Sequence, residues 1–286
     1  MPLEPGPLVV VLVLLAAVLH ATWNAIAHSA EDQLVGFALI SSSTLVLGTL
    51  LVIFGDPVSW HYWRLAALSA ALHVAYLLLL MASYQVADLS RAYPLSRGTG
   101  VALVALASVA LPRSPLGVDV VVGTGLVVAG LVGVTLAGPP LTRSDSWGIA
   151  TALGTGVAIA GYTIVDGLAV SGGAPVLAYA GWLMLLQSWV VPLYAVVKRG
   201  RSLLTIGRRQ ALTGLTGGAV SLLAYGLVLL AQTSGALAAI AALRELSIGL
   251  GVLIGVFVLH EQAARKRLLP ALVLTAGAVV LALSIG

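Results

Sequence analysis

The sequence predicts an all-α integral membrane protein whose ten transmembrane helices form two inverted five-helix repeats. The first observation is composition, because 60% of the 286 residues are hydrophobic and only 8% are charged. A soluble domain carries charge on about a quarter of its residues. The second is a series of apolar runs of roughly 20 residues, each able to cross about 30 Å of hydrocarbon. The third is a similarity between the two halves of the chain.

Ten apolar runs follow one another along the chain, separated by short connections rich in Gly and Pro. In order, we expect helices at 7–28, 34–54, 65–85, 91–111, 117–137, 147–168, 175–197, 211–231, 236–258 and 268–285. No basic segment precedes the first run and no small-residue cleavage site follows it, so we expect a retained helix rather than a signal peptide. The connections leave no room for a soluble domain.

Signatures of several other protein classes are missing from the sequence. The basic residues sit in short loops such as 198–209 and form no groove with aromatic residues, which argues against a nucleic-acid partner. There is no cysteine, and the segment 260–264 departs from the HExxH zinc motif because Ala264 replaces the second histidine. Neither a P-loop nor a GxSxG motif is present. We therefore expect no enzyme, metal or cofactor.

The two halves of the chain resemble each other. The segment AYLLLLMA at 75–82 matches AYGLVLLA at 224–231, and after a two-residue slip Arg97 aligns with Arg244. The offset maps the third, fourth and fifth predicted helices onto the eighth, ninth and tenth.

This alignment also pairs Gly130 with Gly277 and divides the chain into five-helix units at 1–140 and 141–286. Because five is odd, the second unit is expected to be inverted relative to the first. Inverted repeats are a common plan of transporters, in which the substrate site lies near the membrane midplane between the two halves.

Two arginines lie well inside predicted helices. Centring an arginine in a spanning helix costs about 2.5–3.5 kcal/mol, so we expect Arg97 and Arg244 to face the protein interior. Asp166 and Glu245 are the available counter-charges. Glu245 points about 100° away from its neighbour Arg244, which makes Asp166 the expected partner of Arg244. The arginines and acids either form a structural ion pair between helices or bind a substrate carboxylate or a coupling proton.

Aromatic and polar side chains share single faces of other predicted helices. His73 and Tyr76 lie on one face of the third helix, and Tyr225 repeats this pattern on the eighth. Such a stripe indicates either a cavity lining or ordinary core packing. On the first helix, His20, Trp23 and Asn24 follow at i, i+3 and i+4, and Tyr162 with Asp166 forms a similar pair on the sixth. Trp23 by itself is equally typical of the aromatic belt at the membrane surface.

The sequence resembles the EamA-type transporters of the drug/metabolite transporter superfamily over essentially its whole length. The matching stretches are HATWNAIAH (20–28), AYLLLLMASYQVADLSRAYPLSRGTG (75–100), AGYTIVDG (160–167) and AYGLVLLAQTSGALAAIAALRELSIGLGVLIGVFVLHE (224–261). The resemblance implies two inverted five-helix halves, alternating access and export of amino acids, related metabolites or drugs. It implies a cavity lined by Trp23, His73, Tyr76, Tyr93, Arg97, Tyr162, Asp166, Tyr225 and Arg244.

One position departs from this pattern. The small four-helix exporters of the superfamily use a first-helix glutamate for proton coupling, where this chain offers Asn24. The resemblance therefore does not carry proton antiport over to this chain. The two indications of orientation also disagree. The odd-numbered loops hold most of the basic residues and should be cytoplasmic, which would place both termini outside. The family places both termini inside.

We therefore expect a secondary transporter or exporter of a small metabolite in the cell membrane, acting as a monomer or homodimer. The solute would be amino-acid-like, otherwise zwitterionic or anionic, or a drug. The alternative is a lipid flippase or a non-transporting intramembrane accessory protein. The expected substrate-binding residues are His20, Trp23, Asn24, His73, Tyr76, Tyr93, Arg97, Tyr162, Asp166, Tyr225, Arg244 and Glu245.

Overall fold

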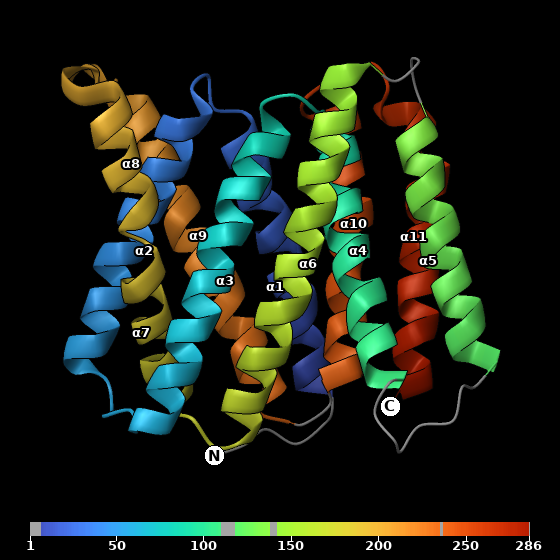
Figure 1. Ribbon diagram of the computed structural model, residues 1–286, viewed down its shortest axis with the longest axis horizontal. Coiled ribbons are helices and arrows are strands. Elements are labelled where there is room, and N and C mark those ends of the chain that lie inside the picture. The colour runs from blue at the N-terminus through green and yellow to red at the C-terminus, as the bar shows by residue number, and fades with distance from the viewer. Residues whose placement is uncertain (1–6, 110–117, 138–141, 235–236, 286) are drawn as a thin grey trace.

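The computed structural model describes residues 7–109, 118–137, 142–234 and 237–285, and throughout these residues the regular structure is helical (Figure 1). The helices are α1 (Pro7–His28), α2 (Gln33–Phe54), α3 (Trp60–Tyr84), α4 (Leu89–Val109), α5 (Val118–Leu136), α6 (Arg143–Ser171), α7 (Val176–Gln187), α8 (Val190–Arg199), the 3-10 helix η1 (Gly200–Thr205), α9 (Arg208–Gln232), α10 (Leu237–Phe257) and α11 (Ala264–Ile285).

Within the described residues, each of the ten predicted runs coincides with helix, which confirms the all-α expectation; positions 110–111, 117 and 236 of these runs lie outside the described residues. By length and composition, six of the described spans are apolar and long enough to cross a membrane, and α7 and α8 together make up one of them. The chain is therefore a multi-pass membrane protein.

Several helices begin earlier than the apolar runs do. Helix α6 begins at Arg143 rather than at 147, because Thr142 and Asp145 form a capping box that holds a polar first turn. Helix α3 likewise begins at Trp60, directly after the N-cap residue Ser59. Hydrophobicity marks only the lipid-facing length of a helix, so polar, capped turns beyond it are missed.

The seventh span is broken between α7 and α8, around Ser188 and Trp189. Pro192 lies in the first turn of α8 and has no backbone N–H to donate to the carbonyl of Ser188. A proline is tolerated in a first helical turn, so the chain turns at this point and resumes a helix. The break leaves Gln187 and Ser188 at a helix end in the interior of the bundle.

The helices run side by side in one elongated bundle, with α1 beginning and α11 ending at the same edge (Figure 1). We call this the lower edge and the opposite one, where α3 ends and α4 begins, the upper edge. Helix α3 packs against α6 and α1 against α9 in the centre, while α5 packs against α11 at one end and α2 against α7 at the other.

Small residues allow the close approach of α5 and α11. A Cβ atom added to Gly130 would lie 2.5 Å from the Cβ atom of Leu274, and one added to Gly277 would lie 2.6 Å from the backbone nitrogen of Val127. Both glycines are therefore required by backbone proximity, as expected where close packing joins helices in a membrane. Large apolar side chains such as Phe54 cover the outside of the bundle.

Charged groups hold the start of α4 at the upper edge. The carboxylate of Glu261 accepts hydrogen bonds from the backbone nitrogens of Leu89 at 2.7 Å and Ser90 at 3.0 Å. Arg267, only 1% exposed, donates to Asp88 at 2.7 Å and to the Ser90 hydroxyl at 2.6 Å. Helix α4 is thereby tied to α11 and to the loop before it.

Candidate solute-binding cavity

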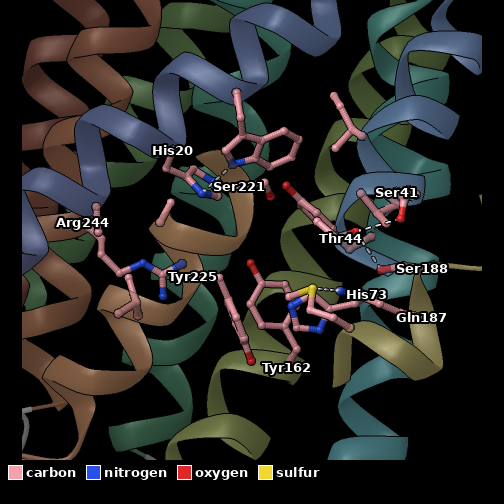
Figure 2. A pocket seen from close by; sticks show the side chains of 18 of the residues that line it. His20, Ser41, Thr44, His73, Tyr162, Gln187, Ser188, Ser221, Tyr225 and Arg244 are labelled. Carbon is pink, nitrogen blue, oxygen red and sulfur yellow. Dashed lines mark hydrogen bonds between the residues drawn. The ribbon is translucent and has the colours of Figure 1, made fainter. Parts of the chain in front are cut away.

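A cavity lies in the interior of the bundle, lined by α1, α2, α3, α4, α6, α7, α9 and α10 (Figure 2). The centres of water molecules have about 60 Å3 available in it. That is room for a few waters or one small organic solute. The lining residues are Ala16, Ala17, His20, Trp23, Ile40, Ser41, Thr44, His73, Tyr76, Leu77, Arg97, Tyr162, Met184, Gln187, Ser188, Ser221, Ala224, Tyr225, Val228, Arg244 and Ser247.

One end of the cavity is cationic. Arg97 on α4 and Arg244 on α10 both line it, and Arg97 is 2% exposed. Each follows the first residue of its helix by seven or eight positions, which places it about 10–12 Å along the axis. His20 on α1 lies beside Arg244 in the view of Figure 2 and accepts a hydrogen bond at Nδ1 from the indole nitrogen of Trp23. The two arginines are carried by helices that run in opposite directions, since α4 begins at the upper edge and α10 at the lower edge (Figure 1).

Four rings, those of His73, Tyr76, Tyr162 and Tyr225, form an aromatic wall of the cavity. The ring of His73 stacks on Tyr162 with centroids 3.9 Å apart, and Tyr225 meets His73 edge-on at 5.6 Å. Tyr76 approaches Tyr162 edge-on at 5.8 Å. The Nδ1 atom of His73 lies 2.9 Å from the carbonyl oxygen of Ser69, so the ring orientation is fixed by its own helix.

The opposite end of the cavity is polar but uncharged. The hydroxyls of Thr44 on α2 and Ser188 are hydrogen-bonded at 2.8 Å, and Thr44 also donates to the carbonyl of Ser41 at 3.0 Å. Gln187 donates from Nε2 to the thioether sulfur of Met184 at 3.1 Å. Its Oε1 atom is buried and meets no hydrogen-bond donor among the residues that the structure describes.

Asp166 lies just below the cavity, behind the aromatic wall. One carboxylate oxygen accepts the Tyr179 hydroxyl at 2.8 Å and the other accepts the Tyr225 hydroxyl at 2.9 Å. The sequence suggested Arg244 as its partner, but no described carboxylate forms an ion pair with Arg244. Asp166 instead joins α6 to α7 and α9 through tyrosines.

Asn24 lies above the cavity, on the side opposite Asp166. Its Oδ1 atom accepts the Tyr84 hydroxyl at 2.8 Å, and its Nδ2 atom donates to the backbone carbonyl of His20 at 2.8 Å. The Tyr84 ring is packed edge-on against His28 at 5.1 Å and against Phe37 at 6.3 Å. These rings pack around the Tyr84 side chain on the upper side.

The structure brings together eight of the twelve residues expected to bind substrate; they line the cavity and are His20, Trp23, His73, Tyr76, Arg97, Tyr162, Tyr225 and Arg244. Asn24 and Asp166 lie next to it. Tyr93 is 1% exposed and reaches the His20 ring at 6.2 Å without lining the cavity. Glu245 is part of α10, but its side chain lies outside the described residues.

Sequence reasoning missed the uncharged end. Its residues are Ser41, Thr44, Gln187 and Ser188. The available signal was the run of hydroxyl residues at 41–44 within an otherwise apolar span, and an amide at 187 in another. Across the described residues, no group of three or more His, Cys, Asp or Glu could hold a metal ion.

No protein-family model matches the sequence, and no curated protein matches it either. Twenty-one chains of solved structures do match. One of them, described only as "Crystal structure of protein", aligns with a TM-score of 0.66 over 96% of this chain and 98% of its own, at 16% sequence identity. At this identity the likeness concerns the fold alone, and it extends over nearly the entire bundle.

Proposed function

We propose that this chain is a secondary transporter that moves a small zwitterionic or anionic metabolite across the cell membrane by alternating access. The observation that carries the proposal is the polar cavity deep inside a bundle of membrane-spanning helices, with Arg97 and Arg244 on its wall. Charged groups inside a membrane are costly to bury, and those that are present commonly mark substrate or ion pathways. No catalytic step or cofactor is part of the proposal.

The proposal includes an inverted repeat of the two halves. If each span of the first half corresponds to the span five later, α1, α2, α3, α4 and α5 correspond to α6, α7 with α8, α9, α10 and α11. The contact of α3 with α6 then has the contact of α9 with α1 as its counterpart. The contact of α4 with α6 becomes that of α10 with α1, and that of α2 with α9 becomes that of α7 with α3. Gly130 and Gly277, aligned in the sequence, both lie at the contact of α5 with α11. Such a recurrence supports two halves that can rock around a central site.

Alternating access also requires that the cavity can be closed on each side. Asn24 with Tyr84 lies above it, and Asp166 with Tyr179 and Tyr225 lies below it. We assign these two groups as the upper and lower latches, which would open in turn. The polar wall between them argues against a lipid flippase, whose cavity should be apolar and open sideways to lipid.

The test is transport by the purified full-length chain in liposomes, with a panel of radiolabelled amino acids and small carboxylates. We expect uptake of at least one solute without ATP, and loss of that uptake in Arg97→Ala. Arg201→Ala, in the exposed segment after α8, is the matched control and should transport normally. If Arg97→Ala transported at the wild-type rate while folded, the assignment of the cavity as the solute site would be wrong. Movement of a fluorescent phospholipid instead of any soluble solute would favour the flippase.

A further inference from the structure

The imidazole ring of His20 makes one hydrogen bond whose direction follows from its partner. The indole nitrogen of Trp23 lies 3.2 Å from the Nδ1 atom of His20, and an indole nitrogen can only donate. The Nδ1 atom therefore accepts and carries no hydrogen. A charged imidazolium has a hydrogen on both nitrogens, so this ring is neutral and has its hydrogen at Nε2. The contact with Trp23 thus selects one of the two neutral tautomers.

The protonated nitrogen of His20 is available to a solute. His20 lines the cavity, and its Nε2 atom forms no hydrogen bond with the described residues. Trp23 is only 3% exposed and meets the imidazole ring edge-on, with centroids 5.3 Å apart. Because Trp23 follows His20 by three positions on α1, one helix sets the whole arrangement. His20 therefore offers the cavity a hydrogen-bond donor rather than an acceptor.

His73 also lines the cavity, but its ring is held in the opposite way. Its Nδ1 atom lies 2.9 Å from the backbone carbonyl oxygen of Ser69, and a carbonyl can only accept. The Ser69 hydroxyl, 3.2 Å from the same nitrogen, can accept from it as well. The Nδ1 atom therefore carries the hydrogen, and in the neutral ring the Nε2 atom keeps a lone pair. The two histidines thus bring opposite hydrogen-bonding groups to one cavity.

We propose that Trp23 is a positioning residue, which keeps the hydrogen of His20 at Nε2 so that His20 donates a hydrogen bond to an acceptor oxygen of the solute. This role rests on the proposed function only in taking the cavity as the solute site, and the tautomers themselves do not depend on transport. A solute group that contacts His20 must then be a carboxylate, carbonyl or hydroxyl oxygen. A group that contacts Nε2 of His73 must carry an N–H or O–H.

The first test observes the tautomers directly. The full-length chain is labelled with nitrogen-15 in its five histidines, placed in phosphatidylcholine nanodiscs and studied by NMR at about pH 8, above the usual histidine pKa. A ring nitrogen that carries a hydrogen has a shift well separated from one that does not. Loss of signals in His20→Gln and His73→Gln identifies the two rings. We expect the hydrogen at Nε2 in His20 and at Nδ1 in His73, and a hydrogen at Nδ1 of His20 overturns the proposal.

Trp23→Phe tests the positioning role, because it removes the donor and keeps an aromatic ring. We expect the two nitrogen shifts of His20 to move toward each other, since the ring can then exchange between its tautomers, while those of His73 stay in place. Trp147→Phe, at a 61% exposed position of α6, is the matched control and should change neither ring. Unchanged His20 shifts in Trp23→Phe would show that Trp23 does not select the tautomer. The wild-type tautomer is decisive even where this variant does not fold.

A pair of variants tests the contact with the solute. His20→Gln keeps an N–H donor at about the distance of Nε2 from the backbone, whereas His20→Met has a similar length and no donor. Neither keeps the imidazole ring, so the difference between them isolates the donor. In liposomes, uptake of the radiolabelled amino acid or carboxylate that the wild type carries should be about tenfold slower in His20→Met than in His20→Gln. Equal uptake in the two variants overturns the donor role.

The outcomes separate this role from the transport function. If the wild type carries no solute of the panel, the transport function fails and the donor role fails with it, while the NMR shifts still decide the tautomers. If His20 has its hydrogen at Nδ1 and uptake is normal, the transporter stands and the positioning role of Trp23 is wrong.

Discussion

The two latches on either side of the cavity differ in chemistry although they occupy corresponding places. In the upper latch, a neutral amide oxygen of Asn24 accepts one hydroxyl, from Tyr84, and joins α1 to α3. In the lower latch, the carboxylate of Asp166 accepts two hydroxyls, from Tyr179 and Tyr225, and joins α6 to both α7 and α9. The two sides of the cavity are thus held by different numbers of hydrogen bonds, two at Asp166 and one at Asn24.

The largest effect is expected from Asp166→Ala. This change leaves two tyrosine hydroxyls without their acceptor, and each polar group left unsatisfied in the interior costs about 1–3 kcal/mol. We expect the free energy of unfolding in detergent to fall by about 3 kcal/mol or more. Because the chain has no cysteine, Ser221→Cys in the cavity can serve as a single reporter. An impermeant maleimide should label it faster from the lower edge in the Asp166→Ala background.

A smaller effect is expected from Tyr84→Phe, which removes the one hydrogen bond of the upper latch. A neutral hydrogen bond contributes about 1 kcal/mol, so the loss of stability should be about a third of that in Asp166→Ala. Labelling of the same cysteine should rise from the upper edge. Tyr194→Phe on the exposed side of α8 is the matched control and should behave as wild type. Equal losses in Tyr84→Phe and Asp166→Ala would contradict the unequal strength of the latches.

The smallest effect is expected at the surface of the upper edge, where Asp32 and Arg199 form an ion pair at 2.7 Å between α2 and the end of α8. The hydrogen bond from Arg199 lowers the pKa of the Asp32 carboxyl. A lowered folded-state pKa stabilises the fold above the usual Asp value of about 4, and this contribution is lost as the pH falls through the lower value. The Tm difference between wild type and Arg199→Gln should therefore be small at pH 7 and vanish on acidification. A difference that grew on acidification would show that the pair does not stabilise the fold.

Much of the fold followed from the sequence because its causes are local. The length of each apolar run and the Gly or Pro residues between the runs indicate where the helices lie. An arginine within a spanning helix must face the protein interior whichever helices pack beside it. The hydrogen-bond partners of Asp166 could not be predicted in this way. Its partner Tyr179 depends on how α7 is placed against α6, which no spacing within one helix reveals. Gln187 was overlooked for the same reason, since the break that turns it toward the cavity depends on Pro192 and on the contact of Ser188 with Thr44.

The anchoring of α4 has a consequence for how the cavity can move. Glu261 holds the first backbone nitrogens of α4, and Arg267 holds Asp88 and Ser90 beside them. Arg97 follows two turns later on the same helix, beyond Pro94, so the helix that carries it is tied at its first turn to α11 and the loop before α11. In the proposed alternating access, α4 would therefore move together with α11, and the helices on the other side of the cavity would move relative to this pair.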